Sequence, residues 1–168
     1  MPGPFVTTGE RRSTPVVRIT ERTLAAAGSL ARGVSPNELG GIIVGWWEGG
    51  RVAIVDDLLP VPDDRAGRAH YERRQWPAQR VLDDYLRTGT SPYSGYIGEW
   101  HSHPEPQPPS PIDRGALSAI VRQVHCPIAL LVLALDRQGE VAVHGLVGRS
   151  RWPHRAVIEH TVVERMEP

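Results

Sequence analysis

Residues 98–113 read GEWHSHPEPQPPSPID, and no other stretch constrains the fold as closely. A weakly alternating apolar segment leads into it, so we predict a strand over residues 94–103. The four prolines of residues 104–109 exclude regular structure there. We predict a helix over residues 111–124, because Ser110, a proline directly after it and an acid three residues after it are typical of a helix start.

Short apolar runs and turn residues predict the other elements on both sides of this stretch. In chain order, the predicted strands cover residues 16–19, 39–47, 51–59, 94–103, 127–135, 140–147 and 157–163. The predicted helices cover residues 21–32, 76–87 and 111–124. Two pairs of strands are joined by turns so tight that they must form antiparallel hairpins. Hairpins interspersed with helices favour an α+β fold, with a mixed, mostly antiparallel sheet flanked by helices.

The length and composition of the chain are typical of one globular domain. The 168 residues match the usual size of a domain, and 40% of them are apolar, which suffices for a buried core. The first residues are polar and include proline and glycine. We therefore expect a loose N-terminal arm over residues 1–14 and a single domain over residues 15–168.

The charges and the single cysteine argue against several functions. The 19 basic residues balance the 19 acidic ones, so we expect neither nucleic acid nor a membrane surface as a partner. No apolar run reaches the roughly 18 residues of a membrane span, and no secretory signal is visible, so we expect a cytoplasmic protein. Cys126 alone cannot form an internal disulfide or a cysteine-based zinc site. The sequence leaves the oligomeric state open.

His101 and His103 form the candidate site. Side chains two residues apart on a strand project from the same face, about 7 Å apart at Cα. Two imidazoles at that spacing can reach one metal ion, with bonds of about 2.0–2.1 Å. Asp113 follows in the first turn of the next helix, and the proline loop is long enough to fold back, so it can add an oxygen ligand. Three protein ligands and an open position are typical of zinc hydrolases.

Spacing alone leaves two alternatives open at this site. Ser110 and Asp113 can serve only to cap the helix that follows them. Glu99 shares the predicted face of the histidines, so it can be a ligand or a general base as well as Glu38 can.

These residues resemble a known family motif. Residues 101–104, HSHP, and residues 110–113, SPID, resemble the JAMM motif of the MPN+ (JAB-domain) zinc metalloproteases, which is His-x-His-Pro followed by Ser-x-x-Asp. Residues 37–45, NELGGIIVG, look like the upstream element of that family, a glutamate ahead of a Gly-Gly-apolar strand. Residues 96–104, YIGEWHSHP, are similar to bacterial single-domain members. The resemblance covers about residues 16–146 and implies the cytidine-deaminase-like MPN/JAB fold.

The resemblance also implies a role for each residue of the motif. His101, His103 and Asp113 would bind one catalytic Zn²⁺, with its fourth position left for water. Glu38 would act as general base and then as general acid toward the leaving amine, and Ser110 would stabilise the oxyanion. The resemblance selects Glu38 over Glu99 and implies no other cofactor.

Members of this family cleave isopeptide or peptide bonds after the C-termini of ubiquitin-like proteins. The resemblance therefore implies a zinc metallopeptidase whose partners are a ubiquitin-like protein or its conjugates. Some bacterial members act in anti-phage operons such as CBASS, where E1-like or E2-like proteins would be further partners. Two alternatives remain, a non-catalytic MPN scaffold module and an amidase that acts on small molecules or carrier proteins.

Overall fold

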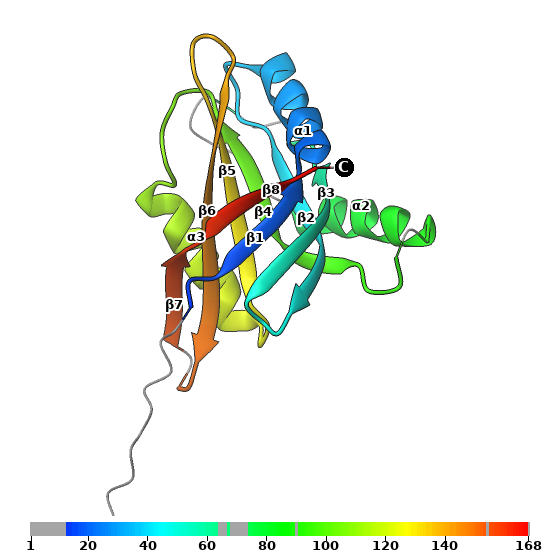
Figure 1. The fold of residues 1–168 in the computed structure, drawn as a ribbon, viewed down its shortest axis with the longest axis vertical. Coiled ribbons are helices and arrows are strands. Elements are labelled where there is room, and N and C mark those ends of the chain that lie inside the picture. The colour runs from blue at the N-terminus through cyan, green and yellow to red at the C-terminus, as the bar shows by residue number, and fades with distance from the viewer. Residues whose placement is uncertain (1–12, 64–66, 68–73, 90, 154, 168) are drawn as a thin grey trace, which may run out of the picture.

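The computed structural model describes residues 13–63, 67, 74–89, 91–153 and 155–167, which form three helices and eight strands (Figure 1). The predicted arm at residues 1–14 lies outside the described residues, apart from its last two. The helices are α1 (Glu21–Val34), α2 (Gln75–Arg87) and α3 (Pro111–Gln123). The strands are β1 (Val16–Thr20), β2 (Gly40–Glu48), β3 (Val52–Pro60), β4 (Gly95–His103), β5 (Ile128–Leu135), β6 (Val141–Arg151), β7 (Arg155–His160) and β8 (Val162–Met166).

The strands form one mixed sheet in the order β7-β6-β5-β4-β2-β3-β1-β8. Four neighbouring pairs are antiparallel, namely β2–β3, β2–β4, β5–β6 and β6–β7. The pairs β4–β5, β1–β3 and β1–β8 are parallel. The structure therefore confirms both predicted hairpins and the α+β class with a mixed, mostly antiparallel sheet.

The sheet is strongly curled, because its two end strands are neighbours in the sequence. Thr161 alone separates β7 from β8, and these two strands lie at opposite ends of the strand order. The backbone N–H of Thr161 donates to the carbonyl of Gly145 (3.1 Å), and its hydroxyl donates to the carbonyl of Pro15 (2.6 Å). The single strand predicted over residues 157–163 is wrong, because the chain stops pairing with β6 here and pairs with β1 from Val162 onward, where the backbone N–H of Val162 donates to the carbonyl of Pro15 (3.1 Å).

β5 is the central strand of the core. All eight of its residues are apolar and buried, and alternate residues face the two sides of the sheet. Leu131 packs on one side in a cluster with Leu24 of α1, and Leu130 packs on the other with Leu117 of α3. A strand that is covered on both faces reads as a continuous apolar run, which is why periodicity alone could not assign its faces.

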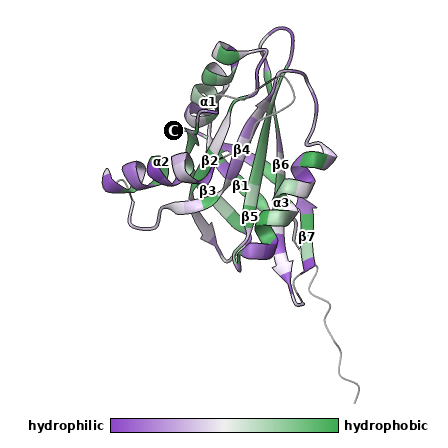
Figure 2. Cartoon of the chain, turned by 180° about the vertical axis from the view of Figure 1, so that it is seen from behind, coloured by the Kyte–Doolittle hydropathy of each residue, from purple (hydrophilic) through white to green (hydrophobic). Residues whose placement is uncertain are grey.

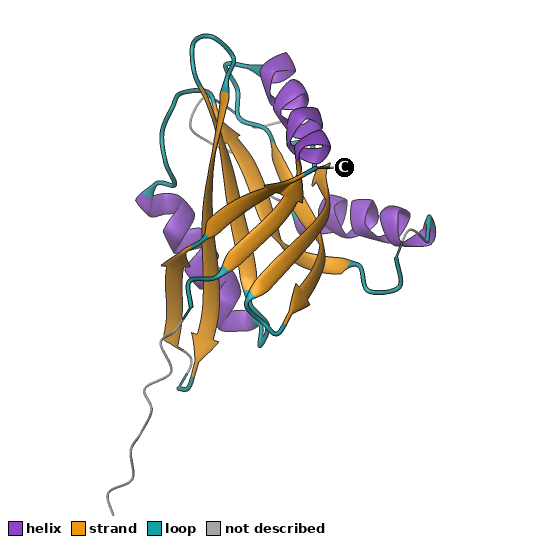
Figure 3. Ribbon diagram, viewed as in Figure 1, coloured by secondary structure: helices purple, strands orange, loops and turns teal. Residues whose placement is uncertain are grey.

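The helices cover the sheet unevenly (Figures 2 and 3). α3 packs on β5, β6 and β7, and α2 packs on β2 through Ala78, which contacts Ile42 and Val44. Ile42 pairs with Glu99 of β4, and Glu99 pairs with Leu130 of β5, so these three residues share a face of the sheet. β4 therefore lies between the strands covered by α2 and α3.

No described helix has the length and apolar character needed to cross a membrane.

Candidate metal centre

The two histidines occupy the end of β4, at the edge of the sheet that the carboxyl ends of β4 and β5 share. Both side chains project from the same face, as the strand period requires, and both residues are buried. Their Nε2 atoms lie 3.1 Å apart. Because one N–H···N hydrogen bond leaves the other ring nitrogens to find partners, the pair depends on groups that arrive from other elements.

Asp113 reaches the histidine pair from the first turn of α3. Its Oδ1 lies 3.2 Å from Nε2 of His101, and its Oδ2 lies 3.5 Å from Nε2 of His103. The carboxylate also accepts the backbone N–H of Ser110 at 2.6 Å, and Ser110 Oγ accepts the backbone N–H of Asp113 at 3.2 Å. This is a capping box, so one carboxylate both caps α3 and faces the histidines. The two interpretations of Asp113 are therefore compatible.

The Asp113 carboxylate and the His103 ring each favour the charged form of the other. Burial by itself would raise the pKa of Asp113, but hydrogen bonds from His101, His103 and Ser110 lower it far below its usual range. The hydrogen bond to Asp113 raises the pKa of His103, and burial opposes that rise only in part. The ionised carboxylate is thus strongly favoured, which is the form that binds a cation.

A backbone carbonyl orients the ring of His103. Its Nδ1 lies 3.0 Å from the carbonyl oxygen of Gln107, in the proline loop. A carbonyl can only accept, so Nδ1 carries the hydrogen, and in the neutral ring Nε2 keeps its lone pair. Histidine ligands of metals are usually held in this way by a second partner.

The three side chains could hold one metal ion. The ligand atoms of His101, His103 and Asp113 all lie within 4.8 Å of one another. A tetrahedral ion with bonds of about 2.0–2.1 Å places its ligand atoms about 3.3 Å apart. The two Nε2 atoms lie 3.1 Å apart, and each lies close to a different carboxylate oxygen of Asp113, at 3.2 Å for His101 and 3.5 Å for His103. Two imidazole nitrogens favour zinc over calcium or magnesium, which prefer oxygen ligands.

Glu38 lies near His103, two residues before the start of β2. Gly40 pairs with His101, and continuing this antiparallel register by two residues places Glu38 opposite His103 and on the same face. The negative charge of Glu38 contributes to the raised pKa of His103, although less than the groups already named. The other candidate, Glu99, accepts a hydrogen bond from the hydroxyl of Tyr96 at 3.2 Å. Glu99 lies on the strand of the histidines and Glu38 across from it, so the choice of Glu38 as general base stays a prediction.

Ser102 and Gln107 contribute to the site, and the sequence did not point to either as functional. Ser102 is fully buried between the two histidines. Its Oγ accepts the backbone N–H of Leu39 (3.0 Å), and its own N–H donates to the carbonyl of Leu39 (2.6 Å). These bonds attach the residue next to Glu38 to the residue between the histidines. The short polar side chain within an HxH pair was the available signal for Ser102, whereas Gln107 acts through its backbone.

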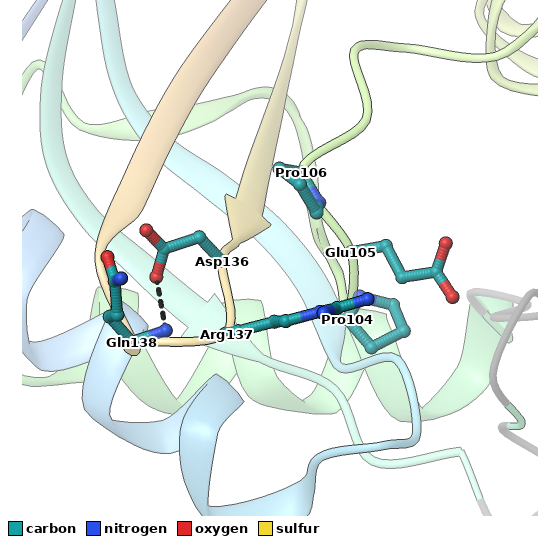
Figure 4. A pocket seen from close by; sticks show the side chains of 6 residues that line it. All are labelled: Pro104, Glu105, Pro106, Asp136, Arg137 and Gln138. Carbon is teal, nitrogen blue, oxygen red and sulfur yellow. Dashed lines mark hydrogen bonds between the residues drawn. The ribbon is translucent and has the colours of Figure 1, made fainter.

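An open pocket of about 540 Å³ lies next to the metal centre (Figure 4). It begins directly after His103 and is lined by Pro104, Glu105, Pro106, Asp136, Arg137 and Gln138. Asp136 accepts hydrogen bonds from the backbone N–H groups of Gln138 and Glu140, both at 2.8 Å. Its carboxylate therefore stabilises the β5–β6 turn. These bonds fix the shape of the turn on one side of the pocket, and the pocket adjoins the loop whose Gln107 carbonyl accepts a hydrogen bond from His103.

Family comparison agrees with this geometry. Residues 20–152 match the Prok-JAB family, the prokaryotic homologs of the JAB domain. The match covers most of the chain, so the protein belongs to this family.

Two curated relatives and one solved structure are similar to this chain. A protein of Sinorhizobium fredii (strain NBRC 101917 / NGR234) named "Probable metalloprotease y4qB" is 26% identical over 118 residues, which are 67% of this chain and 71% of the relative. The "CD-NTase/cGAS isopeptidase" of Escherichia coli (strain TW11681) is 35% identical over 77 residues, 45% of this chain. The match spans 49% of that relative, about half its length. The solution structure of DSY2949 from Desulfitobacterium hafniense has a TM-score of 0.64 at 17% identity, covering 90% of this chain and 94% of the other, and shows a shared fold.

Proposed function

We propose that this protein is a zinc-dependent peptidase or isopeptidase that hydrolyses the bond after the C-terminus of a ubiquitin-like protein. The observation that carries the proposal is the meeting of His101, His103 and Asp113, whose ligand atoms lie within 4.8 Å of one another. Family membership and the names of two relatives support peptidase or isopeptidase chemistry in general. The ubiquitin-like substrate and the identity of the metal are parts of the proposal.

The three proposed ligands would leave one position on a zinc ion free. A bound zinc ion lowers the pKa of water to about 7 and polarises a carbonyl group. Glu38 would take a proton from the attacking water at its carboxylate and pass that proton to the amine that leaves, because an amine leaves poorly unless it is protonated. Its position opposite His103 brings this carboxylate to the same face as the ligands.

Ser110 would stabilise the negative charge that develops on the carbonyl oxygen. Its Oγ accepts the backbone N–H of Asp113, and this leaves the hydroxyl hydrogen available to a substrate oxygen. A donor that is already held by a helix cap does not need to reorient during the reaction, which is the basis of electrostatic stabilisation.

The proposed partner is a ubiquitin-like protein or its conjugate, with E1-like or E2-like proteins from the same operon. The extended C-terminal tail of such a protein can lie in an open cleft at the edge of a sheet. The Escherichia coli relative is named an isopeptidase, and this supports cleavage of conjugates. A role in anti-phage defence and a cytoplasmic location belong to the same proposal.

A cleavage assay tests the function directly. The zinc-loaded protein and its Glu38→Gln variant are each mixed with a ubiquitin-like protein fused to a reporter and with an isopeptide-linked conjugate. We expect wild type to cleave at least one substrate and Glu38→Gln to cleave neither while it retains zinc. Zinc retention by both proteins without cleavage by wild type would instead support a scaffold module. Cleavage of acyl-amino acids alone would support a small-molecule amidase.

A further inference from the structure

Three arginines from the β2–β3 and β6–β7 hairpins lie together, because Arg149 donates to the carbonyl of Gly50 and the charges of Arg51 and Arg151 act on it; Figure 1 shows the two hairpins. Arg51 follows the β2–β3 turn, and Arg149 and Arg151 end β6; we call these three residues the arginine cluster. The end of β6 lies beside the amino end of β5, since Gly148 pairs with Ile128. The metal centre lies at the carboxyl end of β5, so the two sites occupy opposite ends of the sheet.

Arg149 is held in place, but one edge of its guanidinium makes no hydrogen bond among the described residues and faces only the ion-pair partner Glu159. Its Nη1 donates to the carbonyl of Gly50, and the group lies over the ring of Trp47, 5.8 Å from the centroid. Its side chain is only 18% exposed, yet Nε and Nη2 have no hydrogen-bond partner among the described residues, and neither has Nε1 of Trp47. Buried donors without partners are rare in native proteins, so three of them at one place call for an acceptor.

The facing carboxylate, Glu159, does not supply that acceptor. Its Oε2 forms an ion pair with Nε of Arg149 at 3.8 Å, beyond hydrogen-bond distance, and has no hydrogen-bond partner among the described residues. Burial lowers the pKa of Arg149, and the charge of Arg51 and, less strongly, that of Arg151 lower it further, while Glu159 raises it. The positive charge of the cluster thus exceeds what this carboxylate balances.

We propose that the arginine cluster binds a phosphate group, as free phosphate or as a phosphate monoester. Nε and Nη2 of Arg149 lie on one edge of a planar group and donate in parallel, and this geometry matches two oxygens of one oxyanion. The charges of Arg51 and Arg151 favour a multivalent anion over chloride. Trp152 follows Arg151 and is 93% exposed, so an aromatic ring attached to the phosphate could stack on it.

Titration of the full-length, zinc-loaded protein with inorganic phosphate tests the proposal without any assay of catalysis. The indole Nε1–H of Trp47 is followed by NMR, because the ring of Trp47 lies against Arg149 of the cluster. We expect a saturable shift with phosphate and none with potassium chloride at equal ionic strength. AMP forms a second arm: tighter binding than phosphate would identify a nucleotide as the source, and equal binding would identify the phosphate alone. No saturable shift with either would overturn the proposal.

Three variants separate a specific site from general electrostatic attraction. Arg151→Met should weaken phosphate binding about tenfold, the loss of one charge-assisted contact. Arg137→Met removes the same charge from the β5–β6 turn, at the other end of β6, and should leave binding unchanged. Glu159→Gln removes the competing carboxylate and should tighten binding. Equal weakening by the first two variants, or weaker binding in Glu159→Gln, would contradict the proposal.

Discussion

All eight residues of β5 are apolar and buried, whereas its parallel neighbour β4 ends in three buried polar residues, His101, Ser102 and His103. The two strands pair over six residues, so their backbones experience nearly the same surroundings. They differ in what arrives at the end of β4. His101 lies against the carboxylate of Asp113 in α3, and the hydroxyl of Ser102 accepts the backbone N–H of Leu39. The ring of His103 donates to the carbonyl of Gln107. Buried polar groups are tolerated where such partners converge, and there they can carry chemistry.

The comparison predicts that changes at the end of β4 affect the metal, whereas changes in β5 affect stability. Asp113→Ala should have the largest effect: zinc is lost and cleavage with it, because a ligand and the N3 residue of the capping box disappear together. Zinc content after gel filtration measures the first effect. Asp113→Asn is the matched control, since its amide oxygen can still accept the N–H of Ser110 but carries no charge. Full zinc content in Asp113→Ala would remove Asp113 from the proposed ligands.

Leu131→Ala tests the other side of the comparison, in the middle of β5. Leu131 is fully buried in the cluster that includes Leu24 of α1, so truncation should leave a cavity and cost about 2–5 kcal/mol of unfolding free energy. Urea denaturation measures this loss. Zinc stoichiometry of the folded variant should equal that of wild type. A Leu131→Ala protein that is stable but poor in zinc would show that the two strands are not separable in this way.

Ser110→Ala should have an intermediate effect. Loss of an oxyanion donor typically lowers turnover by about a hundredfold or more, and loss of a helix cap costs about 1 kcal/mol. We expect kcat to fall much more than KM changes, together with a small loss of thermal stability. Ser110→Thr should restore the cap and most of the turnover. An unchanged kcat in Ser110→Ala would limit Ser110 to capping α3.

The smallest expected effect is the pH dependence of the metal-free protein. His103 has a raised pKa in the folded state, so its contribution to stability is complete below 6.5 and is lost as the pH rises through the folded value. Asp113 has a lowered pKa, so its contribution is present above 3.8 and is lost as the pH falls toward the folded value. The pair therefore stabilises the metal-free protein most between these limits.

In the presence of zinc, the loss of stability that His103 causes at alkaline pH should be reversed, because zinc competes with the proton for His103. The rise in melting temperature on adding zinc should therefore be larger at about pH 8 than at about pH 6. Thermal unfolding with zinc or with a chelator, at both pH values, measures this difference. Asp113→Asn should show no such dependence. An equal rise at both pH values in wild type would indicate that zinc binds elsewhere.

Local patterns were sufficient for most of the fold. Short-range hydrogen bonds that the residue types predict begin two of the helices. Thr20 caps α1, which starts at Glu21, and Ser110 caps α3. The break at Thr161 was missed, because apolar residues on both sides continue the alternation of one strand. β7 ends there because the chain leaves β6 and pairs with β1 from Val162 onward, and no local signal encodes that distant partner.

By itself, the sequence determined the hairpins, the helix starts and the projection of His101 and His103 from one face, because each depends on neighbours a few residues apart. The tertiary structure decided that Asp113 meets both histidines and that Gln107 orients His103. These contacts join residues from different elements. They exist only after the loop, α3 and β2 have packed around the end of β4, since chain spacing limits such distances without setting them.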